Sequence, residues 1–137
     1  MKPWLVLLTL AAVACGVSAA AARRDFVAPV LASEAYSRAL QVLNDFGYTV
    51  LDADRDAGFI RAERKSSGTG TELLTGTSYF WTITVTMAAD SSGGTRYVVQ
   101  PQNVKEEGGR RSTFGMRLTG AQQAQVDSMV ARLTHRP

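Results

Sequence analysis

The clearest pattern in the chain is the alternation of apolar and polar residues from Tyr79 to Met87. Aromatic and aliphatic side chains occupy every second position, and threonine fills most of the others. This period of two is typical of a β-strand with one buried face, so the sequence predicts a strand here. The second face carries Phe80, Thr82 and Thr84, which we expect to be exposed to solvent or covered by a partner.

Weaker alternation with polar, glycine-containing turns predicts further strands on both sides of this one. They are Tyr48–Ala53, Phe59–Lys65, Thr95–Val104 and a fifth, short strand around Phe114, Met116 and Leu118. Gly58 is placed for a positive φ in the first turn. The segment Lys105–Arg111 is predicted to be a charged turn. Pro29, inside the apolar run Phe26–Leu31, predicts an edge strand or an irregular lead-in there.

Two segments have apolar residues at a spacing of three to four, which is typical of an amphipathic helix. The first covers Ser33–Phe46, with Ser33 as the expected N-cap and Gly47 as the stop signal. The second follows Thr119, which with Gln122 forms the pattern of a capping box. The predicted fold is therefore α+β: an antiparallel meander of four or five strands, with both helices packed on one face.

The length of 137 residues, with 45% hydrophobic and 20% charged residues, fits one folded domain. We assign residues 23–137 to that domain and residues 1–22 to a signal peptide and small-residue linker. Lys2 precedes an apolar run, Trp4–Ala14, which is too short to span a bilayer and fits a secretory signal.

Cys15, the one cysteine of the chain, directly follows that apolar run. The segment Ala12–Cys15 resembles the lipobox of bacterial lipoproteins, and the resemblance implies lipid attachment at Cys15. Gly16, in place of aspartate, then implies an outer-membrane lipoprotein facing the periplasm. Two alternatives remain: ordinary cleavage after small residues such as Ala20–Ala22, or an uncleaved signal anchor over residues 4–22.

The composition excludes most familiar catalytic and metal-binding sites. One cysteine and one histidine cannot form a disulfide framework or a thiolate zinc cluster. We interpret Asp52, Asp54 and Asp56 as turn residues rather than as a calcium loop, and His135 has no residue nearby in the sequence to orient it. We therefore expect no enzyme activity, no metal and no cofactor. The formal charge of +3 without a dense basic stripe also argues against nucleic acid as a partner.

Leu73 and Leu74 stand in a glycine- and threonine-rich loop between two predicted strands and have no evident place in the core. They either fold back or contact lipid or a partner. The aromatic residues Tyr79, Phe80, Trp81 and Tyr97 form a cluster at strand spacing, for which core packing is the expectation. A hollow pocket beside Trp81 and Tyr97 would instead indicate a site for a small ligand.

One stretch resembles a known family. It carries a pattern of helix end, strand, turn and strand, and its residues are Ala39, Leu40, Gly47, Tyr48, Val50, Asp54, Gly58, Ile60 and Ala62. In this pattern the chain is similar to small bacterial envelope lipoproteins with BamC-like modules, over roughly residues 33–104. The resemblance implies an envelope domain without catalytic residues.

The expected function is that of an exported, membrane-anchored envelope lipoprotein that acts as a non-enzymatic binding or assembly module. Its expected partners are the membrane, through the N-terminal lipid, and an envelope protein. The candidate contact residues are Leu73, Leu74, Phe80, Thr82 and Thr84. The alternative is a soluble periplasmic carrier of a small ligand, or an uncharacterised hydrolase.

Overall fold

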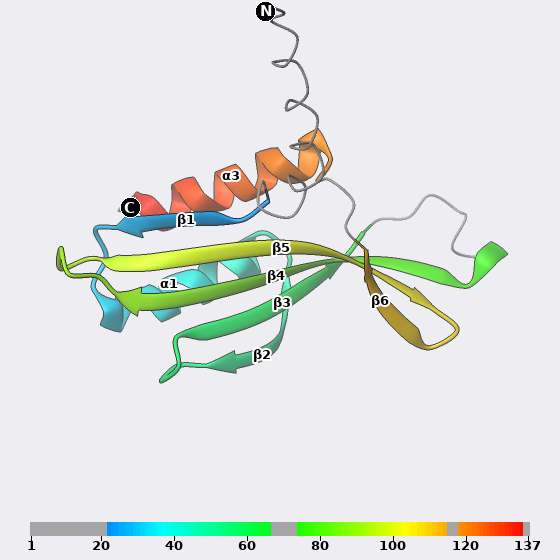
Figure 1. Ribbon diagram of the computed structural model, residues 1–137, viewed down its shortest axis with the longest axis horizontal. Helices are drawn as coiled ribbons and strands as arrows, with labels where there is room; N and C mark the ends of the chain where they lie inside the picture. The colour runs from blue at the N-terminus through cyan, green and yellow to red at the C-terminus, as the bar shows by residue number, and fades with distance from the viewer. Residues whose placement is uncertain (1–21, 67–73, 115–117, 136–137) are drawn as a thin grey trace, which may run out of the picture.

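The computed structural model describes residues 22–66, 74–114 and 118–135. Two helices and six strands follow one another along the chain (Figure 1). They are β1 (Arg24–Ala28), α1 (Ala32–Asp45), β2 (Thr49–Asp54), β3 (Phe59–Lys65), β4 (Thr77–Ala89), β5 (Thr95–Glu107), β6 (Arg110–Phe114) and α3 (Gly120–Thr134). The leader, including Cys15, and Leu73 lie outside the described residues.

The strands form one antiparallel sheet in the order β1-β5-β4-β3-β2, with β6 also paired to β5. The α+β class and the antiparallel meander are confirmed, whereas the expected count of four or five strands is too low. The run before α1 forms β1, which pairs with the first half of β5 and ends before Pro29. Proline lacks a backbone donor, so a strand that stops short of it loses no sheet hydrogen bond.

The hairpin between β5 and β6 is tighter than predicted. Lys105–Glu107 belong to β5 because β4 and β6 offer backbone partners on both sides, and Arg110 and Arg111 begin β6. The turn itself is only Gly108 and Gly109, both with positive φ. Charged residues are thus compatible with strand structure here, because their side chains remain at the surface.

Both helices pack on one face of the sheet and share one core with it. The core combines small and branched residues of the helices with the alternate residues of the central strands. Its buried apolar members are Ala28, Val30, Ala35, Ala39, Val42, Leu43, Tyr48, Ile60, Ala62, Ile83, Val85, Tyr97, Val99, Val126, Met129 and Leu133. Ala35, Ala39, Val42 and Leu43 form the buried face of α1, and Tyr36, Leu40 and Phe46 pack against it partly buried.

The two helix starts differ. At α3 the Thr119 side chain accepts a hydrogen bond from the Gln122 backbone N–H, and the Gln122 side chain accepts one from the Thr119 N–H, so the predicted capping box is confirmed. At α1 the N-cap is Leu31, without a side-chain cap, and Ser33 lies within the first turn. The prediction of Ser33 as N-cap is therefore wrong. Burial of the apolar face stabilises α1 without that contribution.

Candidate interaction surface

The face of the sheet opposite the helices is not covered by either of them (Figure 1). Because side chains alternate along a strand, the neighbours of the buried core residues point to this side. We call it the open face. Over the three central strands it comprises Phe59, Arg61, Glu63, Lys65, Phe80, Thr82, Thr84, Thr86, Ala88, Arg96, Val98, Gln100, Gln102 and Val104.

Three of the residues expected to contact a partner lie together on this face. Thr84 is half-buried, and Thr82 has only 8% of its surface exposed. Thr82 is flanked by Glu63 on β3 and Gln102 on β5, which are its partners in the register. These longer side chains leave the Thr82 hydroxyl little room to contact a partner, contrary to the expectation for this residue.

Phe80, the third of these residues, is covered within the chain. The Arg111 guanidinium lies over the Phe80 ring, 4.7 Å from its centroid. Its nitrogens also approach Glu63 Oε2 at 2.6 Å and Glu106 Oε2 at 3.0 Å. Arg111 therefore closes one end of the open face. With the turn centred on the two glycines, strand pairing places Arg111 beside Glu106. The sequence predicts a broader turn over these residues and therefore does not predict this pair.

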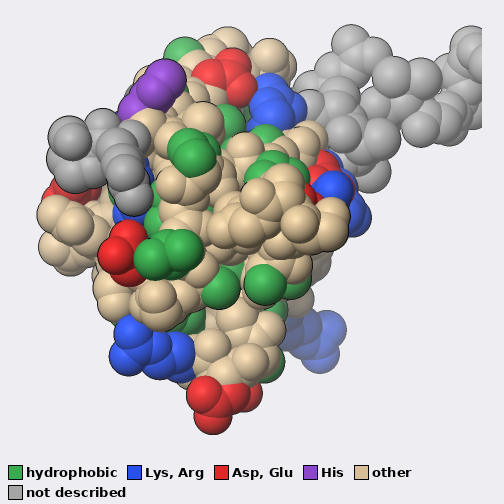
Figure 2. Space-filling view, turned by 90° about the vertical axis from the view of Figure 1, so that its left-hand side faces the viewer, with side chains coloured by type: hydrophobic (Ala, Val, Ile, Leu, Met, Phe, Trp, Pro, Cys, Tyr) green, Lys and Arg blue, Asp and Glu red, His purple; other side chains and the backbone are tan. Residues whose placement is uncertain are grey.

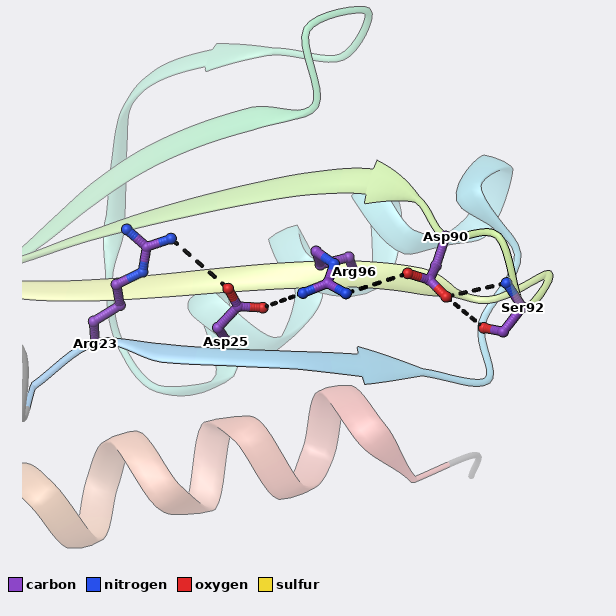
Figure 3. Close-up of polar contacts among 5 residues, drawn as sticks. All are labelled: Arg23, Asp25, Asp90, Ser92 and Arg96. Carbon is purple, nitrogen blue, oxygen red and sulfur yellow. Dashed lines mark hydrogen bonds and ion pairs between the residues drawn. The ribbon is translucent and has the colours of Figure 1, made fainter.

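A second group of charges lies where β1, β5 and the β4–β5 turn meet (Figure 3). Asp25 joins Arg23 at 3.8 Å and Arg96 at 3.0 Å, and Arg96 continues to Asp90 at 3.5 Å. Asp90 also accepts hydrogen bonds from the Ser92 hydroxyl at 2.6 Å and the Ser92 backbone N–H at 3.1 Å. The bonds from Ser92, with Arg96 nearby, lower the pKa of the Asp90 carboxyl. This network links the first strand to the neighbouring turn.

The centre of the open face offers uncharged hydrogen-bonding groups beside Arg61, which lies opposite Thr84. In the part of the chain that the structure describes, the side chains of Thr84, Thr86, Gln100 and Gln102 form no hydrogen bond or ion pair with other residues. Their hydroxyl and amide groups are therefore available to water or to a polar partner. At each end of the face, the charged side chains form ion pairs within their own network. The face as a whole therefore favours a partner without a high net charge.

Leu74 is 88% exposed, at the end of the loop that precedes β4. Among the described residues it is thus an apolar side chain that the core does not use. On the side of the molecule seen in Figure 2, hydrophobic side chains lie in small separate areas among polar and charged groups.

The core beside the aromatic residues is filled. Tyr97 has no exposed surface, stacks on Phe26 at a centroid distance of 5.4 Å, and donates a hydrogen bond to the Ala35 carbonyl. Burial raises the pKa of its hydroxyl. The void beside Trp81 measures only about 10 Å³, which is barely the volume that one water requires. The predicted aromatic cluster is divided, because Phe80 lies on the opposite face and Tyr79, expected in the core, is 41% exposed.

A larger hollow, of about 750 Å³, opens on the helix side between α1 and the end of α3. Its polar lining includes Ser37, Arg38, Asp45 and Arg132 together with His135. Arg38 donates to the Arg132 carbonyl, and Arg132 pairs with Asp45 at 2.8 Å. The Ser37 hydroxyl accepts a hydrogen bond from Arg55, and no hydrogen bond joins Ser37 to His135 among the described contacts.

Asp54 stabilises the turn between β2 and β3 through its side chain. Asp54 Oδ1 accepts hydrogen bonds from the backbone N–H groups of Asp56 and Ala57, each at 2.9 Å. Within residues 22–66, 74–114 and 118–135 there is no group of three or more histidine, cysteine, aspartate or glutamate side chains that could hold a metal ion. Across the same residues, no helix has both the length and the apolar character needed to cross a membrane.

Comparisons with known proteins give similarity to solved structures. No family model matches this chain, and no curated protein matches it. Among solved structures, the chain is similar to a DUF4468 family protein from Bacteroides ovatus ATCC 8483, at 12% identity and a TM-score of 0.45. The match covers 84% of this chain and 85% of that chain.

Proposed function

We propose that this protein is an exported envelope lipoprotein whose folded domain acts as a non-enzymatic binding or assembly module. The observation that carries the proposal is the position of the lone Cys15 at the end of an apolar leader. Acyl chains carried by Cys15 would each contribute about 0.8 kcal/mol per buried CH₂, so two or more chains would anchor the protein stably.

The tether would hold the domain close to the membrane. Eight residues, 16–23, separate the cysteine from the start of β1. A flexible chain of eight residues would span roughly 14–17 Å. The domain would therefore meet partners in or beside the bilayer, at an outer membrane where the cell has one.

Two structural features support a binding module over the alternative of a small-ligand carrier. The void beside Trp81 is too small for a ligand, and Tyr97 is packed on all sides. The open face, in contrast, presents unpaired hydroxyl and amide groups over its centre. A broad polar surface of this kind suits contact with another macromolecule.

The proposal is tested by metabolic labelling with a fatty acid in cells that produce the wild type, Cys15→Ala or Ser18→Ala. We expect label in the wild type and in the Ser18→Ala control, and none in Cys15→Ala, which would also leave the membrane fraction. Equal labelling of all three proteins, or labelling of none, would remove the main support for a lipoprotein.

A further inference from the structure

β2 is the outermost strand of the sheet and is paired along one side only. Within the described chain its backbone bonds to β3, and no other strand lies beyond it. In an antiparallel ladder about half of a strand's N–H and C=O groups point away from its neighbour. On β2 these groups form an edge to which another extended segment can add.

The side chains of this edge are also accessible. All six residues of β2 are exposed, among them Val50 at 41% and Leu51 at 43%. The register shifts between Val50 and Asp52, so Leu51 has no direct partner on β3. Two adjacent aliphatic side chains thus stand at the surface beside unpaired backbone groups.

The edge carries negative charge that the fold does not neutralise. Most carboxylates of the described residues form ion pairs. Those that form none are Glu34, Asp52, Asp54 and Asp56. Three of these four lie on β2 or in the turn that follows it.

The arginines near this edge do not neutralise its carboxylates. Arg55 lies over the Tyr36 ring at 5.6 Å and donates to Ser37, so it is directed toward α1. Arg61 is opposite Asp52 in the register, but no ion pair joins them. Arg61 therefore opposes the negative potential of the edge without cancelling a specific carboxylate.

These charges argue against a second copy of this chain as the occupant. In antiparallel self-pairing centred on position 52 or 53, Asp52 would face Asp52 or Asp54 of the other copy. Like charges directly opposite each other destabilise a strand pair. An extended segment with basic side chains would gain from the same positions.

We propose that the edge of β2 binds an extended, basic and partly apolar segment of a partner protein by β-strand addition. Backbone hydrogen bonds supply the pairing, Val50 and Leu51 supply apolar contacts, and Asp52 and Asp54 select positive charge. The proposed site adjoins the open face, because Arg61 of that face lies opposite Asp52, and the proposal does not depend on lipid at Cys15.

The test uses two hexapeptides with blocked ends, one of alternating lysine and valine and a matched one of alternating glutamate and valine. Each is added to the protein as it is purified from the cells that produce it. Hydrogen exchange of the backbone amides reports which strand is protected. We expect the lysine peptide to slow exchange in β2 by about tenfold at saturation, and the glutamate peptide to leave it unchanged. Added salt should weaken the binding of the lysine peptide.

Three variants test whether the charge at the β2 edge determines binding of the lysine peptide. Asp52→Asn should weaken binding of the lysine peptide by about threefold, and Arg61→Gln should strengthen it by a similar factor. Glu34→Gln removes the same charge from an unpaired carboxylate on α1 and should change nothing. The proposal fails if both peptides protect β2 equally, if protection maps to another strand, if Glu34→Gln matches Asp52→Asn, or if neither peptide binds up to about 5 mM.

Discussion

At Gly58 the chain needs a residue without a side chain for two separate reasons. Its φ is +63°, a conformation that is costly for other residues. A Cβ atom there would also lie 2.2 Å from the Met87 carbonyl oxygen, which is backbone and cannot move aside cheaply. The sequence indicates the first reason through turn chemistry, whereas the approach of β4 is visible only in the structure.

Gly58→Ala should therefore lower the free energy of unfolding by at least about 2 kcal/mol, because it adds a collision to the backbone strain. The control is Gly109→Ala, where φ is +75° but nothing lies within 4 Å of the added Cβ. We expect a loss of about 1 kcal/mol there. Urea unfolding of both variants measures the difference, and equal losses would show that the contact with Met87 is unimportant.

A second residue-scale prediction concerns Asp90, whose pKa is lowered chiefly by hydrogen bonds from Ser92. A lowered pKa means that folding favours the ionised carboxylate. The resulting stabilisation is present above the ordinary aspartate pKa of about 3.9 and is lost as the pH falls through the lower folded value.

Asp90→Asn should accordingly be less stable than the wild type near neutral pH, and the gap should narrow as the pH falls below the ordinary aspartate pKa of about 3.9. Thermal unfolding across this range measures it. Asp56→Asn is the matched control, since no hydrogen bond to the Asp56 carboxylate is found among the described contacts. A gap for Asp90→Asn that does not change with pH would contradict the role of its charge.

At the scale of elements, the existence and type of most segments follow from their periodicity, but their ends depend on neighbours. β5 extends to Glu107 because β4 supplies partners as far as Thr77. The charged residues there favour a turn when only local sequence is considered. The starts of the helices also could not all be predicted from local sequence. A side chain caps α3, whereas no side chain caps α1.

The capping contrast predicts unequal effects of two similar substitutions. Thr119→Ala should lower the free energy of unfolding by about 1 kcal/mol, because the Gln122 N–H loses its acceptor. Ser33→Ala should change it by less than about 0.5 kcal/mol, because Ser33 is exposed within the first turn of α1 and caps nothing. Chemical denaturation distinguishes the two, and a larger effect at Ser33 would contradict the assigned helix start.

At the scale of the whole molecule, the proposed binding function makes the open face sensitive to added charge. Thr84→Arg and Gln100→Arg each place a second bulky cation near Arg61, among the uncharged side chains at the centre of this face. If a partner binds there, each should reduce its recovery by about tenfold, equivalent to about 1.4 kcal/mol.

The measurement is cross-linking in intact membranes followed by purification of the protein. Ala121→Arg adds the same charge at an exposed position of α3, away from the open face, and should retain the partner. Equal recovery with all three variants would place the binding surface elsewhere. Failure to recover any stable partner with the wild type would count against a binding module.

The sequence by itself determined the α+β class, the central strand with its buried and polar faces, the Gly47 and Gly58 turns and the α3 capping box. Each of these depends on residues close together in the chain, where spacing and backbone preference act directly. The separation of Phe80 from Trp81 and Tyr97 follows from the same alternation.

Only the tertiary structure decided the pairing of β1 with β5, the cover that Arg111 places on Phe80, and the open edge of β2. It also decided that the core beside Tyr97 is filled. These features join segments that are distant along the chain, and their energies depend on which surfaces the folded strands and helices bring into contact.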